Sequence, residues 1–347
     1  MIHITAERLE TVVAKVFVGA GVPRDRARRV AHSLVESNLV GHASHGVLRV
    51  DFYDEMMEDG RIDPHGETTV VHESATTALL DGGLNFGQLV AYEGMERAMT
   101  KAREQDMGMV SIHHAGHTGR LGEYVAHAAQ QGFMAMICGS GSGKGGAVAP
   151  YGGVSPVFNT NPIAWGVPAA EHPPIFLDFA TSVSAWGKIR EAIDKQTPLP
   201  EGWILDDEGN PTTDPTALQE GGVMLPFGQH KGYCLSFLVE VVANGLVGNS
   251  CAALPDYEKD YALIMIAVNI AAFQPLNAFC ERVDALIEAT KNAQKAKGVK
   301  EILVPGEYEW KNRERHLKEG LDLPDATWQR IVDTGEKYGV SVEGANE

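Results

Sequence analysis

Three histidines, His113, His114 and His117, stand within five residues and are the first candidates for chemistry in this chain. A histidine can accept or donate a proton near neutral pH. The apolar run Met109 to Ile112 predicts a buried strand before them, and residues 120–131 have the pattern of a helix behind them. Ligands of α/β sheets collect at the carboxyl ends of strands, so the position favours proton transfer by His117. A solvated loop histidine is the alternative that this segment alone leaves open.

The same histidines raise the question of a metal site. No helix brings His113 or His114 onto one face with His117, and no cysteine or acidic ligand cluster accompanies them in the sequence. We therefore expect no metal here. A metal hydrolase is an alternative that unchanged activity after exhaustive chelation would dismiss.

Ser44, His45, Arg49 and Tyr53 form a second candidate cluster. Ser44 and His45 have the character of a helix start, and Arg49 and Tyr53 share a helix face at i, i+4. A guanidinium is well suited to bind a carboxylate, because it can donate two parallel hydrogen bonds to it. An ordinary helix cap followed by a surface arginine explains the same residues, so this cluster alone does not decide.

The glycine-rich residues 139–146 resemble two phosphate-binding loops, the Walker A loop and the Rossmann loop, but match neither. A Walker A loop needs glycine where Cys138 stands and serine or threonine where Gly145 stands. Three spaced glycines match Gly-x-Gly-x-x-Gly, but the following stretch, with Pro150, cannot start the long helix of a Rossmann loop. A mobile loop and a cover over a ligand both remain open.

Three further segments carry weaker signals. Asp178, Phe179 and Ala180 follow a predicted strand and precede a predicted helix, which helix capping alone explains. His230–Lys231 opens another helix, where a cation opposes the macrodipole unless an anion such as a cofactor phosphate lies nearby. The sequence 305–307, Pro-Gly-Glu, has the character of a turn.

The composition excludes several classes of protein. The 347 residues carry a formal net charge of −17 and no basic run, which argues against nucleic-acid binding. No apolar run approaches the ~20 residues that span a bilayer, so no membrane partner is expected. Four scattered cysteines without a Cys-x-x-Cys pair, and an N-terminus without a leader pattern, favour a reduced, cytoplasmic setting.

The elements that must position these residues follow from the apolar periodicity. The N-terminal part is largely helical, and the middle predicts a strand–helix–strand unit with parallel pairing. Gly- and Pro-rich loops are expected at 139–174 and 194–229. The remaining predictions are helices at 5–20, from Pro23 onward, 48–57, 86–103, 120–131, 183–192, 231–243, 276–295 and 324–339, and strands at 109–112, 133–138, 175–177 and 263–268.

The order of the motifs is more specific than any one of them. Seven occur in sequence: Ser44-His45-Gly46-x-x-Arg49, Gly116–Gly122, Thr160–Ala164, Leu177–Ser182, Gly187–Ile189, His230–Tyr233 and Pro305–Glu307. In this order the chain resembles the malate/L-lactate dehydrogenase family. That family also contains ureidoglycolate, sulfolactate and diketogulonate-type dehydrogenases and cyclic imino-acid reductases.

The resemblance implies an α/β fold with two lobes. One is a non-Rossmann nucleotide-binding lobe with a mixed sheet, expected at 116–299. The other is a largely helical substrate and dimer lobe built from both chain ends, expected at 1–115 together with 300–347. It also implies a homodimer, a small anionic carboxylate substrate, and NAD or NADP as cofactor, with NAD slightly favoured.

The resemblance also implies roles for individual residues. His117 acts as general base on the substrate hydroxyl and as acid in reverse, and Arg49 grips the carboxylate with Ser44, His45 and Tyr53 nearby. The residues implied to line the nicotinamide nucleotide are Thr160, Asp178, Phe179, Ala180, His230, Lys231, Pro305, Gly306 and Glu307.

Departures from the family pattern leave the substrate open. His113–His114 replaces the Asn-Ser of some relatives, and Ser142 and Lys144 are the only replacements for a polar substrate contact in the Gly139–Gly146 loop. Asn269 and Lys188 stand where some relatives carry aspartate. A cyclic imino-acid reductase is the second interpretation, and a catalytically silent nucleotide-binding protein is the third.

Overall fold

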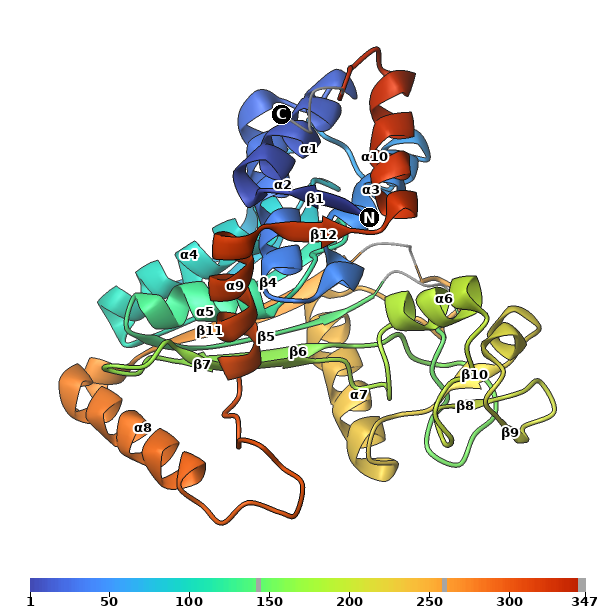
Figure 1. Ribbon diagram of the computed structural model, residues 1–347. Coiled ribbons are helices and arrows are strands. Elements are labelled where there is room, and N and C mark those ends of the chain that lie inside the picture. Colours follow the sequence, from blue (N-terminus) through green and yellow to red (C-terminus); the bar gives the residue numbers. More distant parts are fainter. Residues whose placement is uncertain (142–144, 258–260, 343–347) are drawn as a thin grey trace.

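A seven-stranded mixed sheet lies at the centre of the computed structural model, which describes residues 1–141, 145–257 and 261–342 (Figure 1). Only β3 and β4 pair in parallel, and every other neighbouring pair is antiparallel. In spatial order the strands are β2 (Thr69–Glu73), β3 (Thr77–Asp81), β4 (Met107–Ala115), β11 (Tyr261–Asn269), β5 (Phe133–Ser140), β6 (Ile163–Val167) and β7 (Ile175–Phe179).

The pairing of β4 with β5 differs from the prediction. Both strands form and run in the same direction, but they are not neighbours, because β11 lies between them antiparallel to both. β11 is apolar on both faces, as a central strand must be. The local strand–helix–strand pattern carries no information about a strand that enters from so far along the chain.

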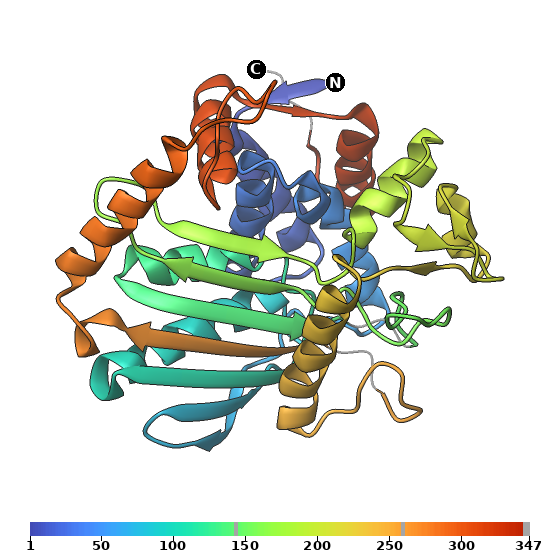
Figure 2. The same cartoon turned by 90° about the horizontal axis from the view of Figure 1, so that it is seen from below.

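Helices cover both faces of this sheet. α4 (Gly87–Gln105) and α5 (Gly122–Gln130) pack on one face, and α7 (His230–Ala243) crosses the other (Figure 2). The apolar side chains of α4 and α5 form a continuous core with the strands, to which each large buried residue contributes about 1.5–3 kcal/mol. Fully buried members of this core include Met95, Met99, Ile112, Tyr124, Ile137 and Met265.

A second core joins the two ends of the chain. α1 (Ala6–Gly19), α2 (Arg24–Leu39), α3 (Val50–Glu58) and α10 (Asp325–Lys337) pack together, and β1 (Ile2–Ile4) pairs with β12 (Leu321–Leu323) beside them (Figure 1). Thr5 caps α1 as predicted, since its hydroxyl accepts the amide of Arg8. The shared buried residues include Leu9, Val13, Leu34, Tyr53, Phe86 and Ile331.

The central sheet contains strands from both sides of residue 115 in the sequence. Its strands β2, β3 and β4 all precede or end at that residue, whereas the other four follow it. A division of the chain at residue 115 would therefore separate paired strands. The helical core instead draws its N-terminal members from residues 4–86.

Two segments expected as loops contain structure. β6 lies inside 139–174, and a small sheet of β8 (Ile204–Leu205), β9 (Pro211–Thr212) and β10 (Val223–Met224) lies inside 194–229. Strands of two residues are too short to show periodicity, so the sequence could not predict them. α6 (Trp186–Lys195) begins three residues later than the helix predicted from Val183, while α8 (Leu276–Lys291) and the unpredicted α9 (Glu307–Glu319) complete the fold. No helix within the described residues is long and apolar enough to cross a membrane.

Candidate active site

His117 follows β4 directly and lies in the loop that leads into α5. Its Nδ1 is 2.8 Å from the hydroxyl oxygen of Tyr53 on α3. That hydroxyl in turn accepts a hydrogen bond from Nε2 of Gln88 on α4, at 2.5 Å. Tyr53 and Gln88 are fully buried, so three elements fix the orientation of the His117 ring and leave its Nε2 edge for a substrate.

Close backbone packing sets the position of this loop. A Cβ atom at Gly87, the first residue of α4, would lie 2.2 Å from the carbonyl oxygen of Gly116 and 2.6 Å from the carbonyl carbon of His117. Only glycine permits this approach. The loop therefore rests directly on the first turn of α4, at the residue that precedes Gln88.

The second cluster predicted from the sequence meets His117 in space. The His45 ring lies parallel to that of His117, with centroids 5.9 Å apart and planes 15° apart. Ser44 Oγ is 3.1 Å from Nδ1 of His45, and Nε of Arg49 donates to the carbonyl oxygen of Ser44 at 2.8 Å. Ser44, His45 and Arg49 belong to two short 3₁₀ turns, η1 (Ala43–His45) and η2 (Val47–Arg49), that precede α3.

Both histidines of this site are held neutral. Burial, followed by the nearby Arg49 charge, lowers the pKa of His117 well below its usual range. Burial and the same guanidinium lower the pKa of His45 to about 3. Burial raises the pKa of Tyr53, which therefore keeps its proton. The site thus offers a neutral imidazole beside a permanent cation, the state that a general base needs.

Arg120 and Asp178 form a neighbouring polar group. Asp178, near the end of β7, accepts the amide of Gly122 at 2.7 Å, and burial raises its pKa although the Arg120 charge opposes this. Arg120 is only 8% exposed, and its Nε and Nη1 have no hydrogen-bond partner among the described residues. A buried guanidinium with two unused donors suits an anionic ligand.

Three of the segments predicted to line a nucleotide lie around one junction. The amide and hydroxyl of Thr181 donate to the carbonyl oxygen of Thr160, and the amide of Phe227 donates to the carbonyl oxygen of Thr181. These bonds bring Thr160 and the Asp178–Ala180 strand end beside the start of α7 at His230 and Lys231. Both of those side chains are exposed. An open helix N-terminus with a lysine fits a phosphate-bearing cofactor.

The fourth segment lies in a different environment. Gly306 packs against the Phe176 ring of β7, and the Glu307 carboxylate pairs with Lys291 and Lys311. Hydrogen bonds from these lysines outweigh burial and hold the pKa of Glu307 at about 2. Glu307 also lines a groove of about 400 Å³ between α8 and α9. Its ion pairs join it to α8 and to its own helix, and within the described part of the chain none of them reaches the His117 cluster.

Other predicted residues fall in three places. Ser142 and Lys144 lie outside the described residues. Lys188, on α6, is exposed and near enough to His45 to depress its pKa. His114 pairs with the Asp81 carboxylate at the end of β3.

Sequence reasoning missed Gln88 and Arg120. Gln88 sits on the apolar face of α4, in line with Ala91 and Met95, and a lone amide on such a face was the available signal. Arg120 is part of the Gly116–Gly122 motif, but nothing local indicated that its side chain would be buried.

Comparison with known proteins identifies the family of this chain. The sequence profile of the malate/L-lactate dehydrogenase family matches residues 4–332. This chain belongs to that family. The L-sulfolactate dehydrogenase of Methanothermobacter thermautotrophicus is a relative 33% identical over 347 residues, covering 98% of each chain. The motifs that suggested the resemblance therefore reflect membership along nearly the whole length.

Solved structures of this family share the fold. The malate dehydrogenase of Entamoeba histolytica matches with a TM-score of 0.91 at 28% identity and covers 99% of each chain. A delta1-piperideine-2-carboxylate reductase from Pseudomonas syringae matches with a TM-score of 0.84 at 27% identity, covering 96% of this chain and 100% of the other. The family member described here therefore has a mixed α/β fold common to enzymes with both kinds of name.

Proposed function

We propose that this chain interconverts a small 2-hydroxy acid and its 2-keto acid with a nicotinamide cofactor. The observation that carries the proposal is the partly buried His117, kept neutral by its lowered pKa, with Nδ1 against the Tyr53 hydroxyl and Arg49 nearby. Membership of the malate/L-lactate dehydrogenase family supports an oxidoreductase acting on a CH–OH group. The similarity to malate and sulfolactate dehydrogenases supports an anionic hydroxycarboxylate substrate.

Arg49 binds the substrate carboxylate in this mechanism. Its Nε is committed to the Ser44 carbonyl, which aims the remaining guanidinium nitrogens. The ring of Phe52 lies under the guanidinium, 5.1 Å from its carbon to the ring centroid, and limits its movement. A carboxylate fixed by this fork presents its α-carbon to the neighbouring His117, and such positioning supplies much of the rate.

His117 moves the proton. In hydroxy-acid oxidation, Nε2 accepts the hydroxyl proton as the C–O bond gains double-bond character, and the same nitrogen returns it in reduction. To act as a base at Nε2, the neutral ring carries its proton on Nδ1 and directs it at the Tyr53 oxygen, which can accept it. The amide of Gly119 lies 3.3 Å from Nδ1 and donates to it only in the other tautomer. The bound nicotinamide supplies the hydride acceptor or donor.

The cofactor is proposed to lie along Thr160, the Asp178–Ala180 strand end and the start of α7 at His230–Lys231. The helix N-terminus and Lys231 suit its phosphates, and the buried Arg120 offers further donors on the same side. NAD is slightly favoured over NADP. Pro305, Gly306 and Glu307 remain proposed contacts at the edge of this site, with Gly306 already against β7.

The decisive experiment measures turnover and cofactor binding separately. A panel of 2-keto acids is assayed with NADH and with NADPH, and His117→Ala is compared with the unaltered enzyme. We expect loss of turnover by at least about 100-fold with cofactor affinity retained. Near-normal turnover in His117→Ala would contradict the assignment. Failure to oxidise either cofactor with any acid would favour a catalytically silent nucleotide-binding protein.

A cyclic imino-acid reductase is the second candidate, favoured by the likeness to the piperideine-2-carboxylate reductase structure. Such a substrate also carries a carboxylate for Arg49 but needs a proton at nitrogen. Steady-state assays with a piperideine carboxylate beside 2-keto acids separate the two. A higher kcat/KM for the imine by tenfold or so would reverse the order of the proposals.

The proposal includes a homodimer in the cytoplasm. Phe237, Leu238 and Val241 form an exposed apolar face on α7, being 52%, 55% and 47% exposed. Exposed apolar surface of this kind favours burial by a partner. Sedimentation analysis of the unaltered chain and of Leu238→Glu tests this, since we expect a dimer in the first and dissociation in the second.

A further inference from the structure

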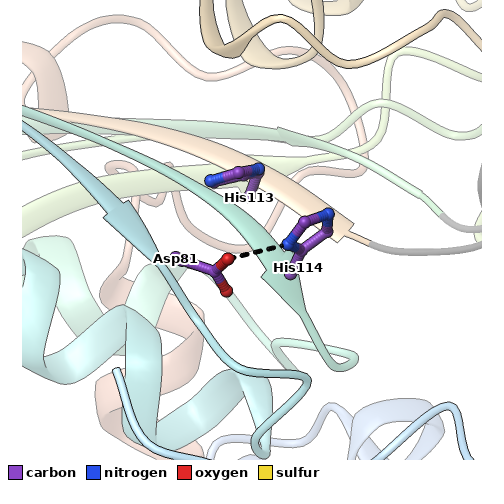
Figure 3. A group of neighbouring side chains, drawn as sticks. All are labelled: Asp81, His113 and His114. Atoms are coloured by element: carbon purple, nitrogen blue, oxygen red, sulfur yellow. Dashed lines mark hydrogen bonds and ion pairs between the residues drawn. The ribbon is translucent and has the colours of Figure 1, made fainter. Parts of the chain in front are cut away.

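Asp81, His113 and His114 form a compact donor group beside the active-site loop. Asp81 ends β3, and the two histidines stand near the end of β4 (Figure 3). One oxygen or nitrogen from each of the three lies within 4.8 Å of the others. Nδ1 of His114 is 3.0 Å from a carboxylate oxygen of Asp81. Asp81 is far from these histidines in sequence and comes from another strand, so no local pattern indicates it as their acidic partner.

The backbone explains why consecutive histidines face the same way. Neighbouring side chains of a regular strand point to opposite faces. His114 has φ of +50°, in the left-handed region, which turns its ring toward that of His113, with centroids 4.2 Å apart. Such a conformation costs about 1–3 kcal/mol for a residue other than glycine. The strained turn therefore gathers two imidazoles on one side.

The parallel pairing of β3 with β4 brings the carboxylate to them. Asp81 is the register partner of His113, and the amide of Gly83 fixes its carboxylate at 2.8 Å. Backbone bonds from Gly82 and Leu84 to the carbonyl oxygens of His113 and His114 hold the two chain segments together. The donor group is thus positioned by strands rather than by mobile loops.

We propose that Asp81, His113 and His114 bind a divalent transition metal such as Zn²⁺. Two imidazole nitrogens and one carboxylate oxygen are a donor set that Zn²⁺ prefers, with water filling the remaining position. Ligands at about 2.1 Å from a tetrahedral metal lie about 3.4 Å apart, so the side chains need to move inward by about an ångström. The Asp81 and His114 side chains are 33% and 35% exposed, which gives the ion an entry path.

The bound ion acts as a structural clamp between the ends of β3 and β4. It takes no part in the hydride transfer, since His117 is three residues further along and is bonded to Tyr53. Its effect is to stabilise the strand end from which the catalytic loop starts. The site therefore stands whether or not the proposed reaction is correct.

Titration of the metal-free full-length protein with ZnCl₂ tests this site. We expect one ion per chain with a dissociation constant on the order of micromolar or tighter, no binding of Mg²⁺ at equal concentration, and a rise in Tm on the order of 2–4 °C at saturation. His113→Asn and His114→Asn should each weaken binding by at least about tenfold. Zn²⁺ binding of unchanged affinity in both variants, or its absence in the unaltered protein, would overturn the proposal.

A matched variant controls for loss of a surface histidine. His172 pairs with the carboxylate of Glu288 at 3.1 Å and is 34% exposed, like His114, but is outside the donor group. His172→Asn should bind Zn²⁺ as the unaltered protein does. Co²⁺ gives a second reading without any variant. A visible spectrum of nitrogen and oxygen ligation supports the site, and a thiolate charge-transfer band would assign the ion to a cysteine instead.

Discussion

The hydroxyl oxygen of Tyr53 lies 2.8 Å from Nδ1 of His117, and this hydrogen bond joins the helical core to the sheet core at the proposed general base. Tyr53 belongs to the helical core, whereas the loop of His117 leaves β4 in the sheet core. Burial raises the pKa of the tyrosine and lowers that of the histidine, so both stay neutral at rest. In the proposed reaction, the imidazolium of His117 would donate from Nδ1 to this neutral hydroxyl.

Tyr53→Phe should reduce kcat by about 10- to 100-fold, because a hydrogen bond to a charged group contributes about 1.5–3 kcal/mol. The KM for the acid should change little, since Arg49 is untouched. Steady-state kinetics in both directions measure this. Tyr338→Phe is the control, because its hydroxyl also bonds a buried acceptor on α3, the Asp54 carboxylate at 2.6 Å, rather than His117. Equal losses in the two variants would show a general effect of packing.

Gln88→Leu removes the donor to Tyr53 and tests the outer part of this chain of bonds. The Oε1 atom of Gln88 is buried without a hydrogen-bond partner among the described residues. Burial of this unpaired oxygen offsets much of what the amide contributes to the stability of the fold. We expect kcat to fall by about 3- to 10-fold with less than about 1 kcal/mol change in unfolding free energy. Kinetics and urea unfolding on the same samples decide it. An intact kcat would mean that Tyr53 needs no second anchor.

Arg49→Lys keeps the charge but removes the fork and the bond to Ser44. We expect the KM for the 2-keto acid to rise by about 10- to 100-fold, because a lysine cannot reproduce bidentate recognition. Arg61→Lys is a close control, since its guanidinium also lies over the Phe52 ring, at 5.7 Å, but is paired with Asp59. A KM in Arg49→Lys as low as in the control would place carboxylate binding elsewhere.

The sequence predicts most of the helices because their apolar faces repeat locally. α1, α2, α5 and α7 differ from prediction by a few residues at their ends. The placement of β11 between β4 and β5, and the short strands β8 to β10, depend on contacts between distant segments. No local pattern contains that information, so the sheet order could not be predicted.

The candidate site shows the same division. His117, Arg49 and His45 stand out by residue type and motif, and the structure brings them together. Gln88 and Asp81 do not, because each gains its role only when another element packs against it. The expectation of no metal considered only ligands close to His117 in the sequence. The donor group forms between two strands, because Asp81 lies on β3 and the histidines lie on β4.

The pH dependence of stability provides a test that needs no substrate. Burial and the Arg49 charge lower the pKa of native His45 from an ordinary 6.5 to about 3. Between pH 6.5 and about pH 3, His45 binds a proton in the unfolded chain but stays unprotonated in the native protein. The stability due to neutral His45 is thus complete above about pH 6.5 and declines as pH falls toward 3. His117 acts in the same direction because its pKa is also lowered.

His45→Asn should therefore flatten this dependence. Urea unfolding at pH 7.5 and at pH 5 gives the loss of free energy on acidification, and we expect a smaller loss in the variant than in the unaltered protein. His65→Asn replaces an exposed histidine and should leave the loss unchanged. If His45→Asn and the unaltered protein lose the same free energy between the two pH values, His45 does not remain neutral in the native state.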